Sequence, residues 1–359
     1  MNKKFMRILI LLVISAAVLT GCAAGVRAES TPGLTVTDES VYVAYLSKVY
    51  QIDPATGMLL SSYPDNSSAS LVMYAPPTVS EGGVYFGDLS NQFHKVKDGS
   101  LNQIQWTFKD AKGWYQARAA MDGNLVIVPN SDRNVYALNS DTGELVWKYG
   151  GDFAFIAEPL IIGDKVVVSA QDSHIAVLNY SNGEEIYRIE TKGAVVSPPL
   201  YDPSSGNLFV GSFGKEMTSF NLATGKINWV YGEGKGLETI WATPILVGNQ
   251  LIFNDKSGKI VSLDPVTAQE QWTIDAGGTT IAGLAAINDE GFVVAREDGN
   301  IQAYNLDRIP TWTKTVPGNI YNAPVVHGDQ IFITVINTDG ILYTYGISGQ
   351  DGWVFTPAK

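Results

Sequence analysis

The sequence predicts an all-β fold, an eight-bladed β-propeller whose blades are four-stranded antiparallel sheets. Three observations support this prediction. A turn phrase recurs every 40 to 45 residues, short β-rich runs precede each copy, and no amphipathic helical pattern of ten or more residues occurs after residue 30. A fixed period of this size indicates one supersecondary unit copied many times, and four strands in about 42 residues are typical of a propeller blade.

The phrase combines an Asp or Asn anchor, a Gly four residues later and a large aromatic eight residues later, most clearly over 139–147 and 221–229. Asp and Asn open a turn by bonding the backbone two residues on, and Gly adopts a positive φ that other residues resist. We expect the aromatic to begin the next strand and pack against the neighbouring unit, where each buried ring stabilises the fold by roughly 3–5 kcal/mol. The anchors fall at Asp53, Asp98, Asn139, Asn179, Asn221, Asp264, Asn305 and Tyr345, which makes eight units.

The expected docking aromatics deviate from the phrase in two units. Trp312 stands one residue before its expected place, and Ser61 occupies the aromatic position of the first unit. This departure suggests that the ring closes at the first unit, and the phase of the repeat leaves no obvious strand to swap across the seam. The docking residues are Trp106, Trp147, Tyr187, Trp229, Trp272, Trp312 and Trp353.

Two hairpin strands precede each anchor, and a shorter strand after a Pro comes before them. In the third unit the hairpin strands are 124–128 and 134–138. In the sixth and seventh units a Ser-Gly pair at 257–258 and an Asp-Gly pair at 298–299 separate the β-rich runs, which is a strong hairpin signal. A β-sandwich is the alternative fold, but sandwiches do not carry an eight-fold phrase.

The phrase (Val/Ile)-Tyr-Ala-Leu-(Asp/Asn)-x-x-Thr-Gly-x-x-x-Trp resembles the tryptophan-docking repeat of the pyrroloquinoline-quinone (PQQ)-like propellers. The resemblance covers about residues 34–356 and implies one propeller domain over 34–359. Within that family, the size and layout are similar to those of the outer-membrane assembly lipoproteins. The resemblance therefore implies a non-enzymatic scaffold that mediates protein–protein interaction at the cell envelope, in its sharpest form in outer-membrane protein assembly.

The N-terminus is predicted to be a lipoprotein signal peptide over residues 1–21. Three basic residues precede an apolar run at 8–20, which is too short to span a bilayer and suits a signal-peptide core. The run ends in Leu-Thr-Gly-Cys at 19–22, which resembles the bacterial lipobox, so Cys22 is expected to carry the lipid. Residues 22–33 would then form a tether, and the protein would be anchored outside the cytoplasm, at the outer membrane and periplasm or on the external cell surface. The alternative is an ordinary secretory peptide with a chance cysteine.

The charge of the chain argues against nucleic acid as a partner. The sequence has 24 Lys and Arg, three of them in the first 21 residues, so 21 remain against 36 Asp and Glu, for a net charge of −15 after cleavage. A chain this acidic repels polyphosphate and anionic membrane surfaces. We therefore expect the lipid, not charge, to hold the protein at the membrane.

The sequence predicts no catalytic residue, and neither PQQ nor a metal is expected. Quinoprotein dehydrogenases stack PQQ against a disulfide between adjacent cysteines and carry a calcium site, whereas this chain has one cysteine and no Asp/Glu cluster with ligand spacing. The histidines, His94, His174 and His327, lie in different units without metal-ligand spacing. His174 falls in a tight turn, where an exposed polar residue is ordinary. A reduced quinoprotein is thus the least favoured of the alternatives.

The segments that join each docking aromatic to the next Pro vary most and are expected to line one mouth of the central channel. Aromatic residues with a nearby Arg are typical of binding hot spots, and a charge near the axis needs a partner or water. These side chains either bind a protein partner, bind a small molecule or glycan in a sensor or carrier, or fill the channel as inner core. The candidates are Tyr74, Trp114, Tyr115, Arg118, Phe153, Phe155, Glu158, Glu238, Trp241 and Tyr321.

Overall fold

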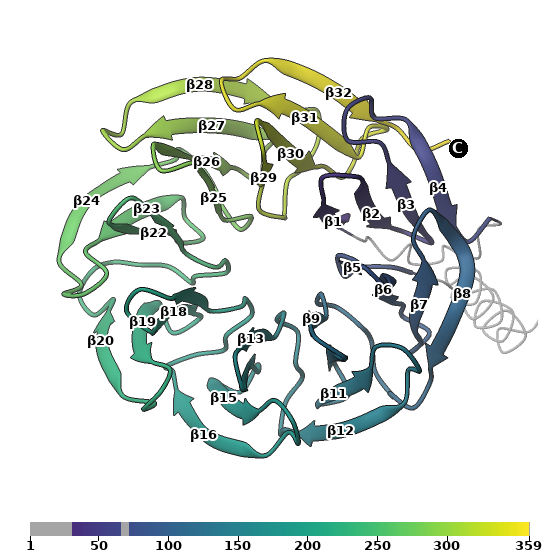
Figure 1. Ribbon diagram of the computed structural model, residues 1–359. Coiled ribbons are helices and arrows are strands. Elements are labelled where there is room, and N and C mark those ends of the chain that lie inside the picture. The colour runs from purple at the N-terminus through teal and green to yellow at the C-terminus, as the bar shows by residue number, and fades with distance from the viewer. Residues whose placement is uncertain (1–30, 66–71, 359) are drawn as a thin grey trace, which may run out of the picture.

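The computed structural model describes residues 31–65 and 72–358, and these form eight sheets arranged in a ring (Figure 1). Each sheet consists of four strands consecutive in sequence and paired antiparallel. The described residues contain no helix. The predicted eight-bladed propeller is therefore confirmed. The signal peptide expected over 1–21 and Cys22 lie outside the described residues, as does most of the predicted tether.

The strands occupy four concentric positions in the ring. The innermost strands are β1 (Gly33–Val36), β5 (Thr78–Ser80), β9 (Ala120–Asp122), β13 (Leu160–Ile162), β17 (Leu200–Asp202), β21 (Ile245–Val247), β25 (Leu284–Ile287) and β29 (Val325–His327). The second strands are β2 (Val41–Tyr45), β6 (Gly83–Gly87), β10 (Leu125–Asn130), β14 (Lys165–Ser169), β18 (Asn207–Ser212), β22 (Gln250–Asn254), β26 (Gly291–Ala295) and β30 (Gln330–Thr334).

The outer half of each blade follows the same order. The third strands are β3 (Lys48–Ile52), β7 (Phe93–Lys97), β11 (Asn134–Asn139), β15 (His174–Asn179), β19 (Glu216–Asn221), β23 (Lys259–Leu263), β27 (Asn300–Asn305) and β31 (Leu342–Gly346). The outermost strands are β4 (Leu59–Tyr63), β8 (Ser100–Phe108), β12 (Leu145–Gly150), β16 (Glu185–Glu190), β20 (Ile227–Tyr231), β24 (Glu270–Asp275), β28 (Pro310–Thr315) and β32 (Asp351–Phe355).

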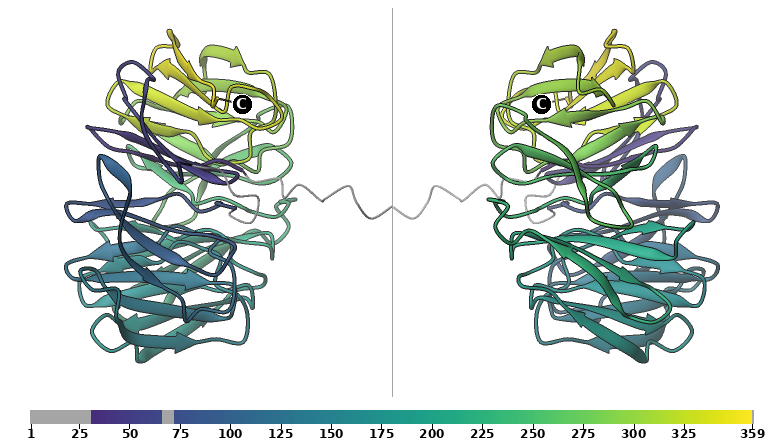
Figure 2. Two further views of the ribbon diagram at one scale, coloured as in Figure 1. Left: turned by 90° about the vertical axis from the view of Figure 1, so that its right-hand side faces the viewer. Right: turned by 90° about the vertical axis from the view of Figure 1, so that its left-hand side faces the viewer.

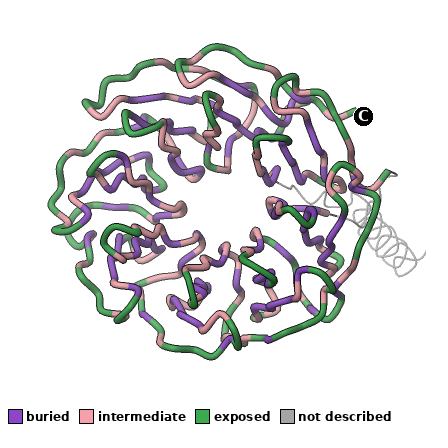
Figure 3. Tube along the Cα trace, in the orientation of Figure 1, coloured by how far each residue is buried: buried purple, intermediate pink, exposed green. Residues whose placement is uncertain are grey.

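The core lies between neighbouring blades. Residues of the second and third strands are mostly buried, whereas many residues of the outermost strands are exposed to solvent (Figure 3). Between blades 3 and 4, for example, Ile127 and Ala137 of one blade meet Val166 and Leu178 of the next. Each blade thus buries an apolar face on both sides, which a single four-stranded sheet cannot do alone.

In six of the eight blades a docking aromatic joins the blade to the next one through a main-chain carbonyl. Trp147 of blade 3 donates from Nε1 to the Tyr180 carbonyl of blade 4, at 2.8 Å. Its indole lies directly on Gly183, which has a φ of 72°. A Cβ at Gly183 would lie 2.5 Å from the indole, so this position requires Gly for the ring as well as for the backbone. The same arrangement pairs Trp106 with Gly143, Tyr187 with Gly225, Trp312 with Gly349, and Trp353 with Gly57.

Turn length explains why Trp312 comes one residue early. Trp312 pairs with Ala303, in the register in which Trp147 pairs with Ala137. The blade 7 turn is shorter, because Asn305 N donates to a carbonyl four residues on, whereas the corresponding turn in blade 3 spans five.

The blade 8 turn is shortened in the same way, and this corrects the anchor expected there. Gly346 pairs with the first residue of β30, as Asn139 pairs with the first residue of β10. Gly346 N then bonds the carbonyl four residues on. The anchor of blade 8 is therefore Gly346 and not Tyr345.

Two blades depart from the docking arrangement. Ser61 occupies the aromatic register in blade 1, opposite Gln51, and its Oγ accepts from Leu101 N of blade 2 at 3.3 Å. In blade 6 the Trp272 Nε1 donates within its own blade, to Gln250 Oε1 at 2.8 Å. The Trp272 ring still stacks on Phe292 of blade 7, with centroids 6.0 Å apart.

The ring closes between blades 8 and 1 without exchanging a strand. Trp353 Nε1 donates to the Pro54 carbonyl at 2.9 Å, which is the same docking contact that Trp147 makes between blades 3 and 4. Asn322 Nδ2 donates to the Pro32 carbonyl at 2.8 Å beside the axis. The seam is thus an ordinary blade interface.

The disc has two different flat faces (Figure 2). One, here called the loop face, carries the connections between blades and the turns between second and third strands. The other, the turn face, carries the turns between first and second strands and between third and fourth strands. Within the described part of the chain, we find no helix long and apolar enough to cross a membrane.

Candidate partner-binding face

Two aromatic side chains stand out from the loop face. Trp114 and Phe153 are 52% and 53% exposed, and they belong to the neighbouring connections β8–β9 and β12–β13. The main chain beneath Trp114 is fixed, because its N–H donates to Ser131 Oγ at 2.6 Å and its carbonyl accepts from Ser131 N at 3.1 Å. Large rings on a rigid backbone lose little entropy on binding, which suits them to anchor a partner.

Two other candidates point inward and belong to the core. Tyr115 and Phe155 are only 1% and 2% exposed. The Tyr115 ring lies 5.4 Å from that of Phe93, over Gly87, where an added Cβ would lie 2.3 Å from Tyr115. Burial raises the pKa of Tyr115 well above its usual range. These two rings present no surface to a partner, although the sequence grouped them with their exposed neighbours.

Trp241 forms part of a cluster that includes two residues absent from the sequence prediction. Its ring centroid lies 4.5 Å from that of Phe213, and Lys256 Nζ lies 5.8 Å from the ring centroid. Its Nε1 donates to Thr239 Oγ1 at 2.9 Å. Phe213 and Lys256 come from the second-to-third-strand turns of blades 5 and 6. Their shared turn position in consecutive units was the signal available in the sequence.

The remaining loop-face candidates are held by polar contacts. Glu238 pairs with Lys215 Nζ at 3.0 Å, and both side chains are about half exposed. Tyr321 donates from its hydroxyl to Glu297 Oε1 at 2.9 Å. Tyr74 is half-buried in the connection between blades 1 and 2, part of which lies outside the described residues.

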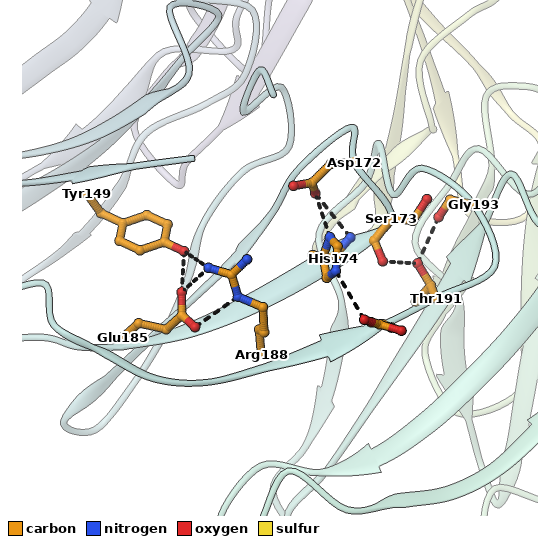
Figure 4. Close-up of polar contacts among 9 residues, drawn as sticks. Tyr149, Asp172, Ser173, His174, Glu185, Arg188, Thr191 and Gly193 are labelled. Atoms are coloured by element: carbon orange, nitrogen blue, oxygen red, sulfur yellow. Dashed lines mark hydrogen bonds and ion pairs between the residues drawn. The ribbon is translucent and has the colours of Figure 1, made fainter. Parts of the chain in front are cut away.

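A small cavity of about 120 Å³ opens between blades 3 and 4, and Tyr149 and Ala176 are among the residues that line it. At its rim the Arg188 guanidinium binds Glu185 with two bonds of 2.9 and 2.6 Å, and the Tyr149 hydroxyl donates to Glu185 at 2.6 Å (Figure 4). The Arg188 bond holds the pKa of Glu185 below its usual value. Burial, and then Glu185, raise the pKa of Tyr149.

His174 lines the same cavity and is not the freely exposed turn residue that the sequence suggested. It begins β15, and its side chain is 30% exposed. Its Nδ1 lies 3.4 Å from Asp172 Oδ1, and its Nε2 lies 3.6 Å from Glu190 Oε1 (Figure 4). The imidazole therefore sits between two carboxylates, an arrangement that the sequence separation of these residues concealed.

Arg118 and Glu158 come together inside the channel, away from the exposed aromatics. Arg118 Nη2 donates to the Leu34 carbonyl at 2.7 Å and to Thr35 Oγ1 at 3.0 Å, and Nη1 lies 3.9 Å from Glu158 Oε2. Burial raises the pKa of Glu158, and Arg118 opposes that rise. The pair thus connects the inner parts of blades 1, 3 and 4. These two side chains therefore take part in contacts between blades as well as lining the channel.

A family model described as outer membrane protein assembly factor BamB matches residues 20–158 and 149–353, which together span most of the chain. The chain belongs to the BamB family. This confirms the resemblance to the PQQ-like propellers.

Two curated BamB proteins align with parts of the chain. That of Burkholderia pseudomallei (strain K96243) is 24% identical over 127 residues, which is 35% of this chain and 32% of the relative. That of Nitrosomonas eutropha (strain DSM 101675 / C91 / Nm57) is 26% identical over 109 residues, which is 30% of this chain and 25% of the relative. The alignments thus span about a third or less of these BamB proteins.

Solved structures share the fold at low sequence identity. The crystal structure of BamB from Moraxella catarrhalis superposes with a TM-score of 0.74 at 14% identity, covering 84% of this chain and 92% of that one. The computationally designed protein Ika8 superposes with a TM-score of 0.73 at 15% identity, covering 89% and 96%. A designed propeller matches as well as BamB does, so these superpositions speak to fold alone.

The residues present do not fit PQQ. The resemblance to quinoprotein dehydrogenases implies a disulfide between adjacent cysteines against which PQQ stacks, and Cys22 is the only cysteine in the sequence. Over residues 31–65 and 72–358, no group of three His, Cys, Asp or Glu side chains is placed to hold a metal ion. No step of a reaction is therefore assigned to this cofactor.

Proposed function

We propose that this protein is a non-enzymatic scaffold of the cell envelope that binds a protein partner in outer-membrane protein assembly, as its membership of the BamB family suggests. The exposure of Trp114 and Phe153 on adjacent, internally bonded connections of the loop face supports this proposal most directly. Charged groups elsewhere on that face, such as Glu238 with Lys215, already pair with one another.

We further propose that Cys22 carries a lipid that holds the protein at the membrane, with the propeller outside the cytoplasm. β1 runs from the loop face to the turn face, where the turn to β2 lies, so its first residue is on the loop face. A tether over 22–33 would therefore leave the ring on the loop face. Replacing Cys22→Ser should abolish labelling by a radioactive fatty acid and move the protein to the soluble envelope fraction. Unchanged labelling would reject Cys22 as the lipid site.

The scaffold role is tested by affinity capture from detergent-solubilised native membranes, comparing the wild type with the double variant Trp114→Ala/Phe153→Ala. We expect wild-type protein to recover an outer-membrane assembly barrel and the variant to recover at least about tenfold less, since hot-spot aromatics each contribute about 2 kcal/mol or more. The control is Val266→Ala/Ile309→Ala, which removes two apolar side chains, 71% and 58% exposed, from the turn face. Equal recovery by both double variants would contradict the assignment of the loop face.

A further inference from the structure

Acidic charge that basic residues do not offset is greatest on the face opposite the exposed aromatics. The turns of the turn face carry 14 Asp and Glu residues and only two basic residues, Lys226 and Arg308. The connections and turns of the loop face carry 13 acidic and nine basic residues over the described chain. A field of one sign on one face attracts ligands of the opposite charge toward it.

A cavity of about 720 Å³ opens on this acidic face, on the side of the ring formed by blades 2 to 4. Three neighbouring innermost strands, β5, β9 and β13, form its walls, and in Figure 1 these strands border the centre of the ring. The wall formed by β9 and the two residues before it extends from Arg118 to Asp122, four residue steps that span about 13 Å in an extended chain. The cavity is therefore a deep recess along one side of the channel.

Carboxylates lie at both ends of this recess. Glu81, Asp122 and Asp141 surround the mouth, and all three residues are exposed. Asp141 already lies 3.7 Å from Nζ of the buried Lys95, so Glu81 and Asp122 supply the uncompensated charge at the mouth. Glu158 lies at the inner end, where Arg118 Nη1 is 3.9 Å away. A close charge-assisted hydrogen bond would measure about 2.7–2.9 Å, so Glu158 keeps capacity for a second cation. Arg118 itself is engaged by the Leu34 carbonyl and Thr35.

The walls between the two acidic ends mix apolar and polar side chains. Pro77, Val79, Ala120, Met121 and Ile161 line the recess between the mouth and Glu158. A Lys or Arg side chain matches this distribution, because its methylene stem contacts apolar atoms while its charged head reaches a carboxylate. Apolar ligands without charge would leave the acidic ends uncompensated.

We propose that this recess binds Lys or Arg side chains of an extended basic segment in a protein partner. The carboxylates continue beyond the cavity, since the Asp141 side chain is 84% exposed and Glu144 follows in the same turn. A ligand longer than the cavity would therefore go on meeting opposite charge after it leaves the mouth. This site goes beyond the scaffold role of the loop face, because it places a second, chemically different partner on the opposite face.

The test measures binding of a fluorescein-labelled octapeptide of alternating Lys and Ser to the full-length protein in detergent, by fluorescence anisotropy. The variant Glu81→Gln/Asp122→Asn removes two mouth charges whose side chains form no hydrogen bond or ion pair with other described residues. The control Asp289→Asn/Glu290→Gln makes the same charge change on the same face, in blade 7. We expect the mouth variant to weaken binding about tenfold or more and the control less than about twofold, with Glu158→Gln also weakening it about threefold.

Three results would overturn the proposal. The first is equal weakening by the mouth and control variants, which would assign binding to the general field of the face. The second is equal affinity for the corresponding Glu-Ser octapeptide. The third is displacement of the peptide by an equimolar concentration of spermidine, which would make a free polyamine the ligand. Trp114→Ala/Phe153→Ala should leave peptide affinity unchanged, so failure of this site and failure of the loop-face scaffold are distinguishable.

Discussion

Adding one methyl group at Gly183 should destabilise the propeller through its docking tryptophan. The φ of 72° at this position costs an L-residue about 1–2 kcal/mol. The new Cβ would also lie 2.5 Å from the Trp147 ring, so the indole must move. Displacement would lose the hydrogen bond to the Tyr180 carbonyl, about 1 kcal/mol, and part of the ring's burial, about 1–2 kcal/mol more. We therefore expect Gly183→Ala to lower the free energy of unfolding by about 3–5 kcal/mol.

Gly163 provides a matched control in the same blade. Its φ is 58°, and no atom lies within 4 Å of the position its Cβ would take. Gly163→Ala should therefore show the backbone cost alone, about 1–2 kcal/mol. The assay is urea denaturation of both variants followed by tryptophan fluorescence and circular dichroism, with the slope compared between proteins. Equal destabilisation by the two substitutions would refute the claim that the indole, and not only the backbone, requires glycine.

Three further predictions concern individual contacts. Arg188 lowers the Glu185 pKa below its ordinary value of 4.5, so this contact stabilises the fold above that pH and its stabilisation is lost as the pH falls through the lowered pKa. Glu185→Gln should remove that part of the pH dependence of thermal unfolding. An unchanged decrease in melting temperature at acid pH would count against this prediction. Arg118→Met should lower the free energy of unfolding at pH 7 by about 1–3 kcal/mol, because Glu158 loses its counter-charge. Adding Glu158→Gln should recover part of that lost stability. Strict additivity in the double-mutant cycle would show that the two side chains do not interact. Trp353→Phe at the ring seam should cost about as much as Trp147→Phe, roughly 1 kcal/mol for the lost hydrogen bond, in chemical denaturation; a much larger cost would mean that the seam is specially strained.

Local patterns in the sequence were sufficient to predict the architecture. The period counted the blades, and the aromatic phrase located the contact between them, because each blade repeats the same solution to burying a sheet on both sides. Even the early position of Trp312 follows from a turn shortened by one residue, with the strand register retained. The misplaced anchor in blade 8 arose where Gly346 replaced the usual Asp or Asn, since Gly carries no side chain that marks the turn.

The binding surface was less accessible from sequence, because connections between blades lack a regular period. Trp114 and Tyr115 are adjacent in the chain, yet one is exposed and the other is buried beneath the connection. The cluster of Phe213, Trp241 and Lys256 draws on three separate segments.

The spacing of residues that are close in the sequence determined the type and the number of blades, since turn formation and docking of the aromatic rings depend on residues a few positions apart. Which side chains face solvent, and which charges share a cavity, depended on bringing segments of different blades together. Arg118 contacts residues 84 positions away in blade 1, and Trp353 contacts Pro54 across 299 positions. Those distances in sequence become contacts only when the ring closes, because closure alone sets which surfaces of the eight blades meet.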